Sequence, residues 1–162
     1  MPTQPPAGEG AAEGRIAAIL AAHAGREGPL LPILQDVQAA LGHVPDEAVP
    51  QIAAALNLSR AEVHGVLTFY HDFRRAPAGR HVVRLCRAEA CQAMGADALA
   101  ARAMARLGVD WHGTSPGGGG VTLDPVFCLG LCACAPAAMV DGVLHGRLDA
   151  AALDALLDGC GA

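Results

Sequence analysis

The chain has 162 residues, a length that suits one ordinary domain or a small domain with a helical extension. It carries a net charge of −5 and no stretch that concentrates basic residues, which argues against a nucleic-acid partner. The N-terminus lacks the basic start and apolar run of a secretory signal, and no window approaches the roughly 18 apolar residues of a membrane span. We therefore expect a cytoplasmic protein without membrane insertion.

The first 75 residues predict a tail followed by an all-α bundle. Residues 1–12 are rich in Pro, Gly and Ala, a composition typical of a mobile tail. Residues 13–75 carry apolar side chains at helical spacing, which predicts four short helices. These are a helix with Ile16, Ile19, Leu20 and His23 on one face that ends at Gly25 or Gly28, a helix over 30–41 that stops at Gly42, a helix from Asp46 to Leu56 with Pro50 in its first turn, and a helix introduced by the capping-box spacing of Ser59 and Glu62.

The second half changes character after the linker-like residues 76–80 and predicts a unit of strands and helices. The expected order is strand, helix, strand, strand, strand, helix, so the whole chain falls into the α+β class. The expected elements are a β-branched strand at 81–85, a helix at 95–107, a glycine-rich loop at 113–120, a strand at 121–123, a hairpin at 138–148 that turns at Asp141-Gly142, and a final helix at 149–157.

Six cysteines form the most distinctive pattern of the sequence. Cys86 ends the first predicted strand, and Cys91 follows after four residues. Cys128 and Cys132 are separated by three residues and follow the second predicted strand. Both pairs stand where a strand gives way to a loop, and two such loops of one sheet can be neighbours in space. Four thiolates could therefore converge there. The remaining cysteines are Cys134 and Cys160.

Three kinds of chemistry fit this pattern. In a reducing cytoplasm, clustered cysteines indicate metal or redox chemistry rather than a disulfide framework. An iron–sulfur cluster needs two thiolates for each iron, and the uncharged stretch 126–136 with Gly130 gives it room and an apolar shell. Structural zinc accepts similar spacings, and a thiol oxidoreductase could use Cys132 and Cys134 as a C-x-C pair. Spacing alone does not decide between iron and zinc.

Two stretches of the sequence resemble a known family. G-R-H-V-V-R-L-C-R-A-E-A-C, residues 79–91, and V-T-L-D-P-V-F-C-L-G-L-C-A-C-A-P-A-A-M-V, residues 121–140, are similar to the thioredoxin-like [2Fe-2S] subunit of NADH dehydrogenases, a family that includes the corresponding subunit of respiratory complex I. The shared pattern is C-x₄-C, a long gap, and then C-L-G-x-C with Ala-Pro soon after. The resemblance extends over about residues 12–158 and includes the helical stretches 31–45 and 58–74.

This resemblance implies a fold, a ligand set and a role. The implied fold is a helical bundle at 13–75 that docks on other subunits, followed by a thioredoxin-like [2Fe-2S] domain at 80–158. The implied ligands are Cys86 and Cys91 for one iron, and Cys128 and Cys132 for the other. The implied role is electron transfer without catalytic residues of its own. The cluster would exchange single electrons with the flavin of a partner subunit that carries FMN and NAD.

Within the family, two short stretches favour one parent complex. F-Y-H-D-F-R at 69–74 and C-A-C-A-P at 132–136 are most similar to the gamma subunit of soluble molybdenum-containing NAD-dependent formate dehydrogenases. That likeness implies a catalytic molybdenum subunit in the wider complex. The alternatives are the equivalent subunit of a bidirectional hydrogenase diaphorase or of respiratory complex I. An interpretation of a different class is a zinc-stabilised interaction module.

The other notable residues are expected to have structural roles. Cys134 is expected to be a small buried side chain, with a ligand beside the cluster as the alternative. Cys160 is expected to be an unliganded thiol in a flexible tail. His71 is interpreted as a structural or interface histidine, and the aromatic residues beside it as core or subunit contact. The glycine run 117–120 lacks the features of a phosphate loop.

Overall fold

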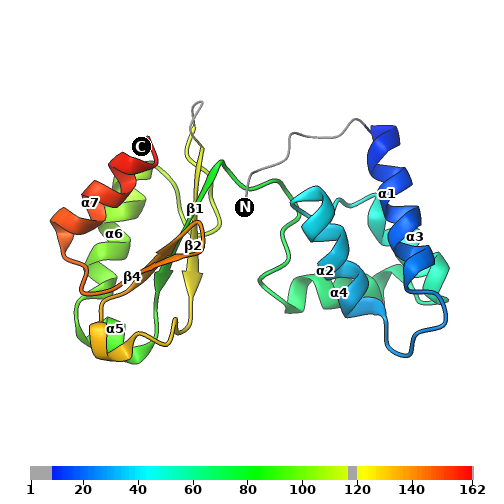
Figure 1. Cartoon of the computed structure of the whole chain (residues 1–162), viewed down its shortest axis with the longest axis horizontal. Helices are drawn as coiled ribbons and strands as arrows, with labels where there is room; N and C mark the ends of the chain where they lie inside the picture. Colours follow the sequence, from blue (N-terminus) through cyan, green and yellow to red (C-terminus); the bar gives the residue numbers. More distant parts are fainter. Residues whose placement is uncertain (1–8, 117–119, 162) are drawn as a thin grey trace. The chain divides into compact units, whose positions relative to one another are not determined.

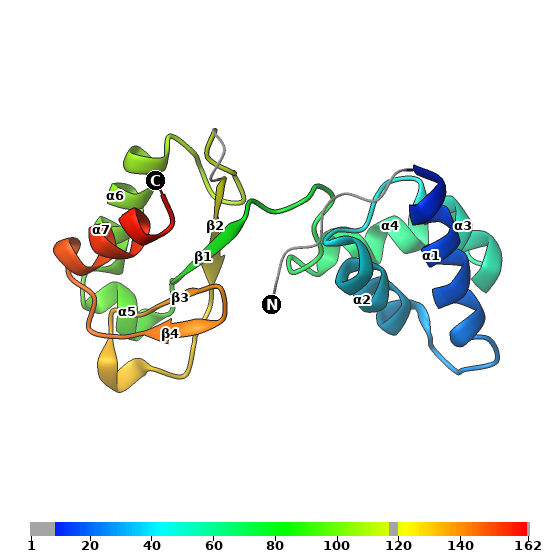
Figure 2. The same cartoon turned by 45° about the horizontal axis from the view of Figure 1, so that its top comes forward.

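A computed structural model describes residues 9–116 and 120–161, and Figures 1 and 2 show it from two directions. The chain divides into two compact units, with the boundary between Pro77 and Ala78. Each unit has a core of its own. Most of the mobile tail predicted at 1–12 lies outside the described residues. No helix in the described ranges is long and apolar enough to cross a membrane.

The first unit contains four helices, as the apolar spacing predicts. They are α1 (Glu9–Ala22), α2 (Leu30–Leu41), α3 (Ala48–Leu56) and α4 (Arg60–Phe69). The buried side chains that hold them together include Ile16, Ile33, Leu34, Val37, Ile52, Val63 and Leu67. Helix α1 begins at Glu9, so residues 9–12, predicted as the end of a mobile tail, are helical. The sequence does not reveal this start, because residues 9–15 are small or polar and show no apolar stripe.

Local signals set the helix ends in this unit. Gly42 stands just past α2 with φ of 81°, a left-handed conformation that suits glycine. The capping box at the start of α4 is present: the Ser59 side chain accepts from the Glu62 backbone N–H, and the Glu62 carboxylate accepts from the Ser59 backbone. Pro50 lies in the first turn of α3, where a missing N–H breaks no helical hydrogen bond.

The aromatic cluster after α4 lies only partly in the core. Phe73 packs against the core of the unit, whereas the Phe69 side chain is 73% exposed and Tyr70 is 43% exposed. The rings of Phe69 and Tyr70 pack edge to face, with their centres 5.1 Å apart. A core role is therefore wrong for Phe69, and His71 is also exposed.

The second unit is a mixed four-stranded sheet with helices. Its elements are β1 (His81–Cys86), α5 (Glu89–Ala93), α6 (Ala96–Leu107), β2 (Val121–Val126), the 3₁₀ turn η1 (Cys132–Cys134), β3 (Ala138–Val140), β4 (Val143–His145) and α7 (Ala150–Gly159). The strand order is β2-β1-β3-β4. Strand β1 runs parallel to β2 and antiparallel to β3. The predicted α+β class is confirmed.

Helices α6 and α7 pack together and bury one face of this sheet (Figure 1). The core between them includes Val83, Leu85, Val121, Leu123, Ala138, Leu153 and Leu157. Cys160, directly after α7, belongs to the same core and is 5% exposed, so its placement in a flexible tail is wrong. Burial raises the pKa of the Cys160 thiol, and the nearby Asp141 carboxylate adds to the effect.

Strand β2 is longer than predicted and lies at one edge of the sheet. It continues through Pro125 to Val126, although proline is a usual sign that a strand ends. Proline is tolerated on an edge strand, because no neighbour on the open side requires its missing N–H. On that side the loop before β2 covers the N–H groups of two residues: Leu123 N donates to Gly113 O at 3.0 Å, and Val121 N donates to Ser115 Oγ at 2.9 Å. The same loop donates to their carbonyls, from His112 N to Leu123 O at 2.7 Å and from Ser115 N to Val121 O at 2.9 Å.

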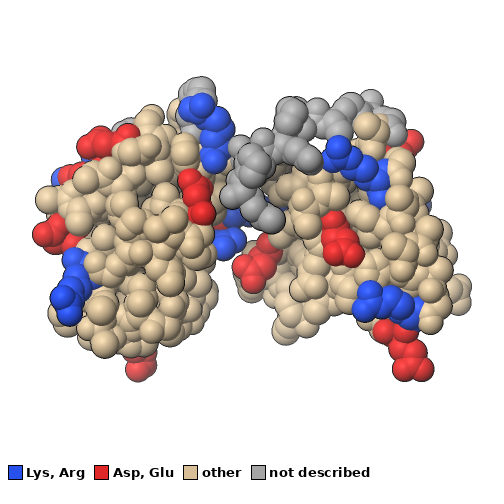
Figure 3. All heavy atoms as spheres, in the orientation of Figure 1, with Lys and Arg blue, Asp and Glu red and all other residues tan. Residues whose placement is uncertain are grey.

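Charged side chains are dispersed over both units. In Figure 3 acidic and basic side chains stand singly or in small mixed groups on the face in view. Several arginines are paired with carboxylates, such as Arg102 with Asp154 and Arg75 with Asp46. This distribution agrees with the absence of a basic stretch in the sequence.

The hairpin between β3 and β4 turns at Asp141-Gly142, as predicted. Both residues have positive φ, 50° and 88°, which is the type I′ pattern that an Asp-Gly pair favours. The Asp141 carboxylate also ties the turn to β1, because it accepts from Val82 N at 2.8 Å and pairs with His81 Nδ1 at 2.7 Å. Burial acts to raise the pKa of Asp141, but His81 and the Val82 N–H outweigh it and hold the pKa below its usual value.

We predict that Asp141→Ala lowers the free energy of unfolding by about 1–2 kcal/mol, because the variant loses two hydrogen bonds and places alanine at positive φ. Asp141→Asn keeps the turn and one acceptor, so its loss should be smaller. The aspartate contribution is full above the unfolded pKa of about 3.9 and is lost as the pH falls through the lowered folded value. Urea unfolding at pH 7 and pH 3 checks both points, and a wild-type advantage that grows at pH 3 would contradict them.

Candidate metal centre

The sheet topology brings the two cysteine pairs to one end of the second unit. Because β1 and β2 are parallel, their last residues, Cys86 and Val126, stand opposite each other in the register. The chain then continues into two adjacent loops. The first leads into α5 with Cys91, and the second carries Cys128 and leads into η1, which begins at Cys132. In both views α5 lies beside the short orange turn η1 (Figures 1 and 2).

Backbone hydrogen bonds fasten the strand ends around these loops. Arg87 N donates to Val126 O at 2.7 Å, which joins the residue after Cys86 to the end of β2. Cys86 N donates to Ala137 O at 3.0 Å on the other side. The first cysteine is therefore held between the two chain segments that enter and leave the second cysteine loop.

Cys86 and Cys91 form the inner pair of the site. Both are nearly fully buried, at 3% and 2% exposure, and their thiols contact each other. Burial acts to raise the pKa of Cys86, but the backbone N–H of Ala88, the Cys91 thiol and the N–H groups of Leu129 and Cys128 together lower it below the ordinary value. The N–H groups of Cys128 and Leu129 in the second loop thus lie close to the sulfur of Cys86, as a thiolate there requires.

The environment of Cys91 favours the protonated thiol. Burial raises its pKa most, followed by its contact with Cys86 and the charges of Cys86 and Cys132. The Ala137 N–H acts in the opposite direction. Several thiolates held this close together repel one another unless a cation lies among them. The site is therefore arranged for positive charge.

Cys128 and Cys132 form an outer, exposed pair. Their sulfur atoms are 3.7 Å apart, and Gly130 N donates to Cys128 Sγ at 3.3 Å. The pKa of Cys132 is raised by its contact with Cys128, by the charge of Cys128, by desolvation and by Cys86. Cys128 has φ of 110°, a conformation that costs a non-glycine residue about 1–3 kcal/mol and is typical of functional sites.

The four cysteines singled out in the sequence come together as two pairs rather than as one tetrahedral group. Within residues 9–116 and 120–161, no three His, Cys, Asp or Glu side chains converge on one metal position. The charge of Cys86 nevertheless helps to raise the pKa of Cys132, and the charge of Cys132 that of Cys91, so the two pairs lie close enough to influence each other. A pair of thiols for each iron, with N–H donors around the sulfurs, fits the demands of a [2Fe-2S] cluster.

Cys134 stands beside this group and is half-buried. It ends the 3₁₀ turn that Cys132 begins, and its carbonyl accepts from Arg147 N at 2.6 Å. Cys160 lies in the core with α7 rather than with the other cysteines. His71 belongs to the helical unit and is exposed.

Gly146 lies directly against Cys134 in the second cysteine loop, which the sequence pattern does not reveal. A Cβ at this position would lie 2.8 Å from Cys134 Cβ and 2.9 Å from the Cys134 carbonyl oxygen. The chain after β4 therefore supports the second cysteine loop from behind, and only glycine permits this approach. The sequence does show a glycine just after a predicted hairpin strand, which can indicate a close backbone approach. It does not show which segment of the chain lies against that glycine.

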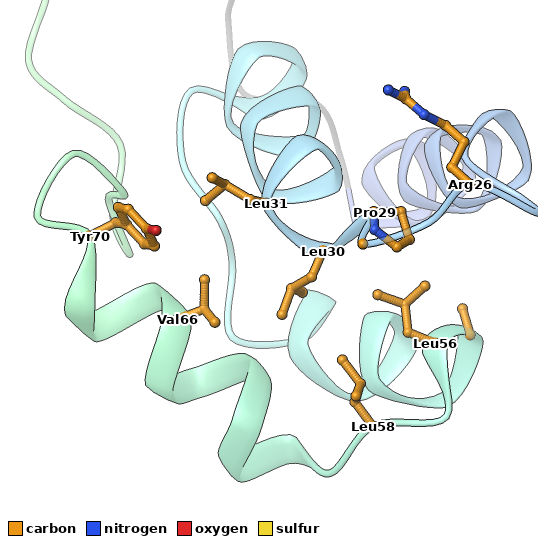
Figure 4. A pocket seen from close by; sticks show the side chains of 10 residues that line it. Arg26, Pro29, Leu30, Leu31, Leu56, Leu58, Val66 and Tyr70 are labelled. Atoms are coloured by element: carbon orange, nitrogen blue, oxygen red, sulfur yellow. The ribbon is translucent and has the colours of Figure 1, made fainter.

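A hollow of about 540 Å³ lies elsewhere, in the helical unit. Figure 4 shows its lining, which is mostly apolar and comes from the segment leading into α2, the end of α3, and α4. Leu30, Leu56, Leu58 and Val66 form its walls, and Tyr70 stands at its edge. None of the residues that line it is a cysteine.

Comparison with known proteins places this site in a family context. The sequence profile of the thioredoxin-like [2Fe-2S] ferredoxin family matches residues 16–161. A relative from Rhizobium meliloti, the second E-type subunit of its NADH-quinone oxidoreductase, is 37% identical over 143 residues, which cover 88% of this chain and 84% of the relative. The HndA subunit of the NADP-reducing hydrogenase of Solidesulfovibrio fructosivorans is 31% identical over 123 residues, which cover 76% and 71% of the two chains.

A solved structure gives the same picture of the fold. A chain of an NAD⁺-reducing [NiFe]-hydrogenase in the H₂-reduced state superposes with a TM-score of 0.64 and 25% sequence identity. The match covers 82% of this chain but only 22% of the hydrogenase chain, so this protein spans about a fifth of that chain's length. The thioredoxin-like fold with N-terminal helices, expected from the resemblance, is confirmed.

We predict that Gly146→Ala displaces the segment from Cys132 to Cys134 and lowers the retention of bound metal about tenfold, a loss typical of changes behind a ligand. Iron content after anaerobic reconstitution, measured alongside the melting temperature, checks this expectation. Gly159→Ala is the matched control, because a Cβ there meets no atom within 4 Å. Full iron retention in Gly146→Ala would show that the close approach does not hold the loop.

Proposed function

The chain belongs to the thioredoxin-like [2Fe-2S] ferredoxin family, and from this premise we propose that it is the electron-transfer subunit of an NAD-linked oxidoreductase complex. In this proposal Cys86 and Cys91 hold one iron, and Cys128 and Cys132 hold the other. The bound cluster supplies the uptake and release of one electron at a time. The subunit has no catalytic residue of its own.

One observation carries this proposal. Two parallel strands end in register, and the loops that follow them present two thiol pairs that are electrostatically coupled. Backbone N–H groups reach the sulfur of Cys86 from both loops, and Gly130 N reaches Cys128 Sγ. Such N–H···S contacts stabilise the negative charge of a cluster and tune its potential.

The zinc alternative fits this geometry less well. Structural zinc takes four ligands in one tetrahedron around one ion. In the described part of the chain, no group of three or more ligand side chains is arranged around a single metal position. Two separate thiol pairs would suit the two irons of a [2Fe-2S] cluster.

The outer thiol pair indicates how electrons reach a partner. Cys128 and Cys132 are exposed, and so are Phe127, directly before Cys128, at 76% and Met94, directly after α5, at 63%. The segment from Val126 to Val140 contains no charged residue. An exposed loop without charged side chains favours a lasting contact with another subunit over a brief, charge-steered encounter. The proposed partner carries the flavin, FMN, and the NAD site.

The helical unit, residues 13–75, is proposed as a second docking element. Its exposed Phe69 and the apolar hollow edged by Tyr70 are of the kind that other proteins cover. Exposed aromatic side chains are frequent anchors in subunit contacts.

For the parent complex we propose an NAD-dependent formate dehydrogenase with a catalytic molybdenum subunit. The support is the likeness of residues 69–74 and 132–136 to its gamma subunit. The relatives named above belong to an NADH-quinone oxidoreductase and an NADP-reducing hydrogenase. A hydrogenase diaphorase and respiratory complex I are therefore the alternatives.

We predict that the protein, purified without oxygen, is red-brown, contains iron and acid-labile sulfide, and bleaches partly with dithionite. Serine at any one of the four proposed ligands should reduce or abolish the cluster, because serine does not replace a thiolate as a soft ligand. The four variants are Cys86→Ser, Cys91→Ser, Cys128→Ser and Cys132→Ser.

Cys134→Ser and Cys160→Ser are the matched controls, and both should keep normal iron and sulfide contents. A colourless protein without iron and sulfide would refute the cluster. A normal cluster in any one of the four ligand variants would refute that ligand assignment.

The parent complex can be identified by co-purification. A tagged chain expressed at native level should bring down a flavoprotein subunit and a molybdenum-containing formate dehydrogenase, both identified by mass spectrometry and metal analysis. Recovery of nickel–iron hydrogenase subunits, or of membrane subunits of complex I, would instead establish one of the alternatives.

A further inference from the structure

Arg87, the residue directly after Cys86, has an unusual environment. Its side chain is 29% exposed, yet its Nε atom is buried and is the one buried side-chain nitrogen or oxygen in the described ranges that lacks a hydrogen-bond partner. The guanidinium carbon lies 5.4 Å from the centre of the Trp111 ring, and Nη2 donates to Asp97 Oδ1 at 3.0 Å. A planar guanidinium that stacks on an aromatic ring is both attracted to it and held in one orientation.

The backbone of the same residue makes two further contacts. Arg87 N donates to Val126 O at 2.7 Å, and Arg87 O accepts from Gln92 Nε2 at 2.9 Å. The first contact reaches the end of β2, just before the second cysteine loop. The second reaches α5, one residue beyond Cys91. Arg87, at the start of the first cysteine loop, is thus joined to the end of that loop at Gln92 and to the start of the second loop at Val126.

We infer that Arg87 is a positioning residue for the cluster: its side chain holds the loop between Cys86 and Cys91 in the one arrangement that presents both buried thiols to the same iron. The inference rests on the proposed function, because it concerns how this chain prepares its ligands. Arg87 itself binds no metal.

The cation–π contact with Trp111 is the main anchor in this inference. Asp97 is 64% exposed, and an ion pair in such a position contributes little by itself. Trp111 is partly buried and packs against the core of the sheet, so it is a fixed surface. The flat guanidinium lies over this ring and reaches Asp97 at the same time. A lysine ammonium carries the same charge but cannot do both, because it is a point charge on a flexible chain.

The test compares three variants of the full-length protein after anaerobic loading with iron and sulfide. The measurements are the rate of iron release to EDTA, the EPR g values of the dithionite-reduced protein and the melting temperature. Arg87→Ala and Arg87→Lys should both release iron about tenfold faster than the wild type, with shifted g values. Arg102→Ala is the control, because Arg102 pairs with Asp154 at 2.8 and 2.5 Å, between α6 and α7 rather than at a cysteine loop.

Each other outcome overturns the inference. If Arg87→Lys behaves like the wild type, charge alone suffices and positioning is refuted. If Arg87→Ala keeps the wild-type release rate and g values, the side chain has no role. If Arg102→Ala changes both readouts as much as Arg87→Ala does, the effect is general loosening of the unit. If the wild type binds no iron and sulfide, the proposed function itself fails. If the wild type binds the cluster but the Arg87 variants do not differ from it, only the inference about Arg87 fails.

Discussion

The parallel pairing of β1 with β2 is the constraint on which the site depends. Antiparallel strands would send the chain away from opposite ends, and the two cysteine pairs would then lie a strand length apart. With parallel strands, Cys86 and Val126 end in register, and both loops leave from the same edge. Helix α6 makes this arrangement possible, because a parallel pair needs a long crossover and a helix packed on the sheet provides it.

At that edge, two opposing electrostatic effects act on the sulfurs. Burial of Cys86 and Cys91 disfavours thiolates, whereas N–H groups from Ala88, Leu129 and Cys128 favour a thiolate at Cys86. The donors come from both loops, so the surroundings of Cys86 depend on the second loop as well as on the first. Cys128, in its strained conformation, brings its own N–H to Cys86 while its sulfur contacts Cys132. The two loops therefore build the surroundings of the proposed first ligand pair together.

Much of this architecture could be predicted from residues with strong local preferences. The stop at Gly42, the capping box at Ser59 and the turn at Asp141 depend on neighbouring atoms alone, and all three are as predicted. Helix α5 and turn η1 could not be predicted, because five and three residues are too few to show a helical period. Tertiary contacts likewise decide the burial of Cys160 and the exposure of Phe69, and short-range patterns do not report them.

The four candidate cysteines could be identified from the sequence because their spacing is specific. The residues that pack behind the cysteine loops could not. Gly146 and Trp111 act on the cysteine loops from distant parts of the chain, and each looks like an ordinary glycine or aromatic residue in isolation. Such residues can be identified only when the chain that they approach is known.

The hydrogen bonds along the outer edge of β2 explain why a proline is tolerated at position 125. Along that side, the N–H groups of Val121 and Leu123 are covered by Ser115 and Gly113, and the next position with the same orientation is 125. At position 125 the described part of the covering loop offers no hydrogen-bond acceptor, and none is needed because proline has no N–H to donate. Proline thus removes one donor from the edge of the sheet nearest the candidate metal centre, and an edge with fewer free donors is a poorer template for pairing with a foreign strand.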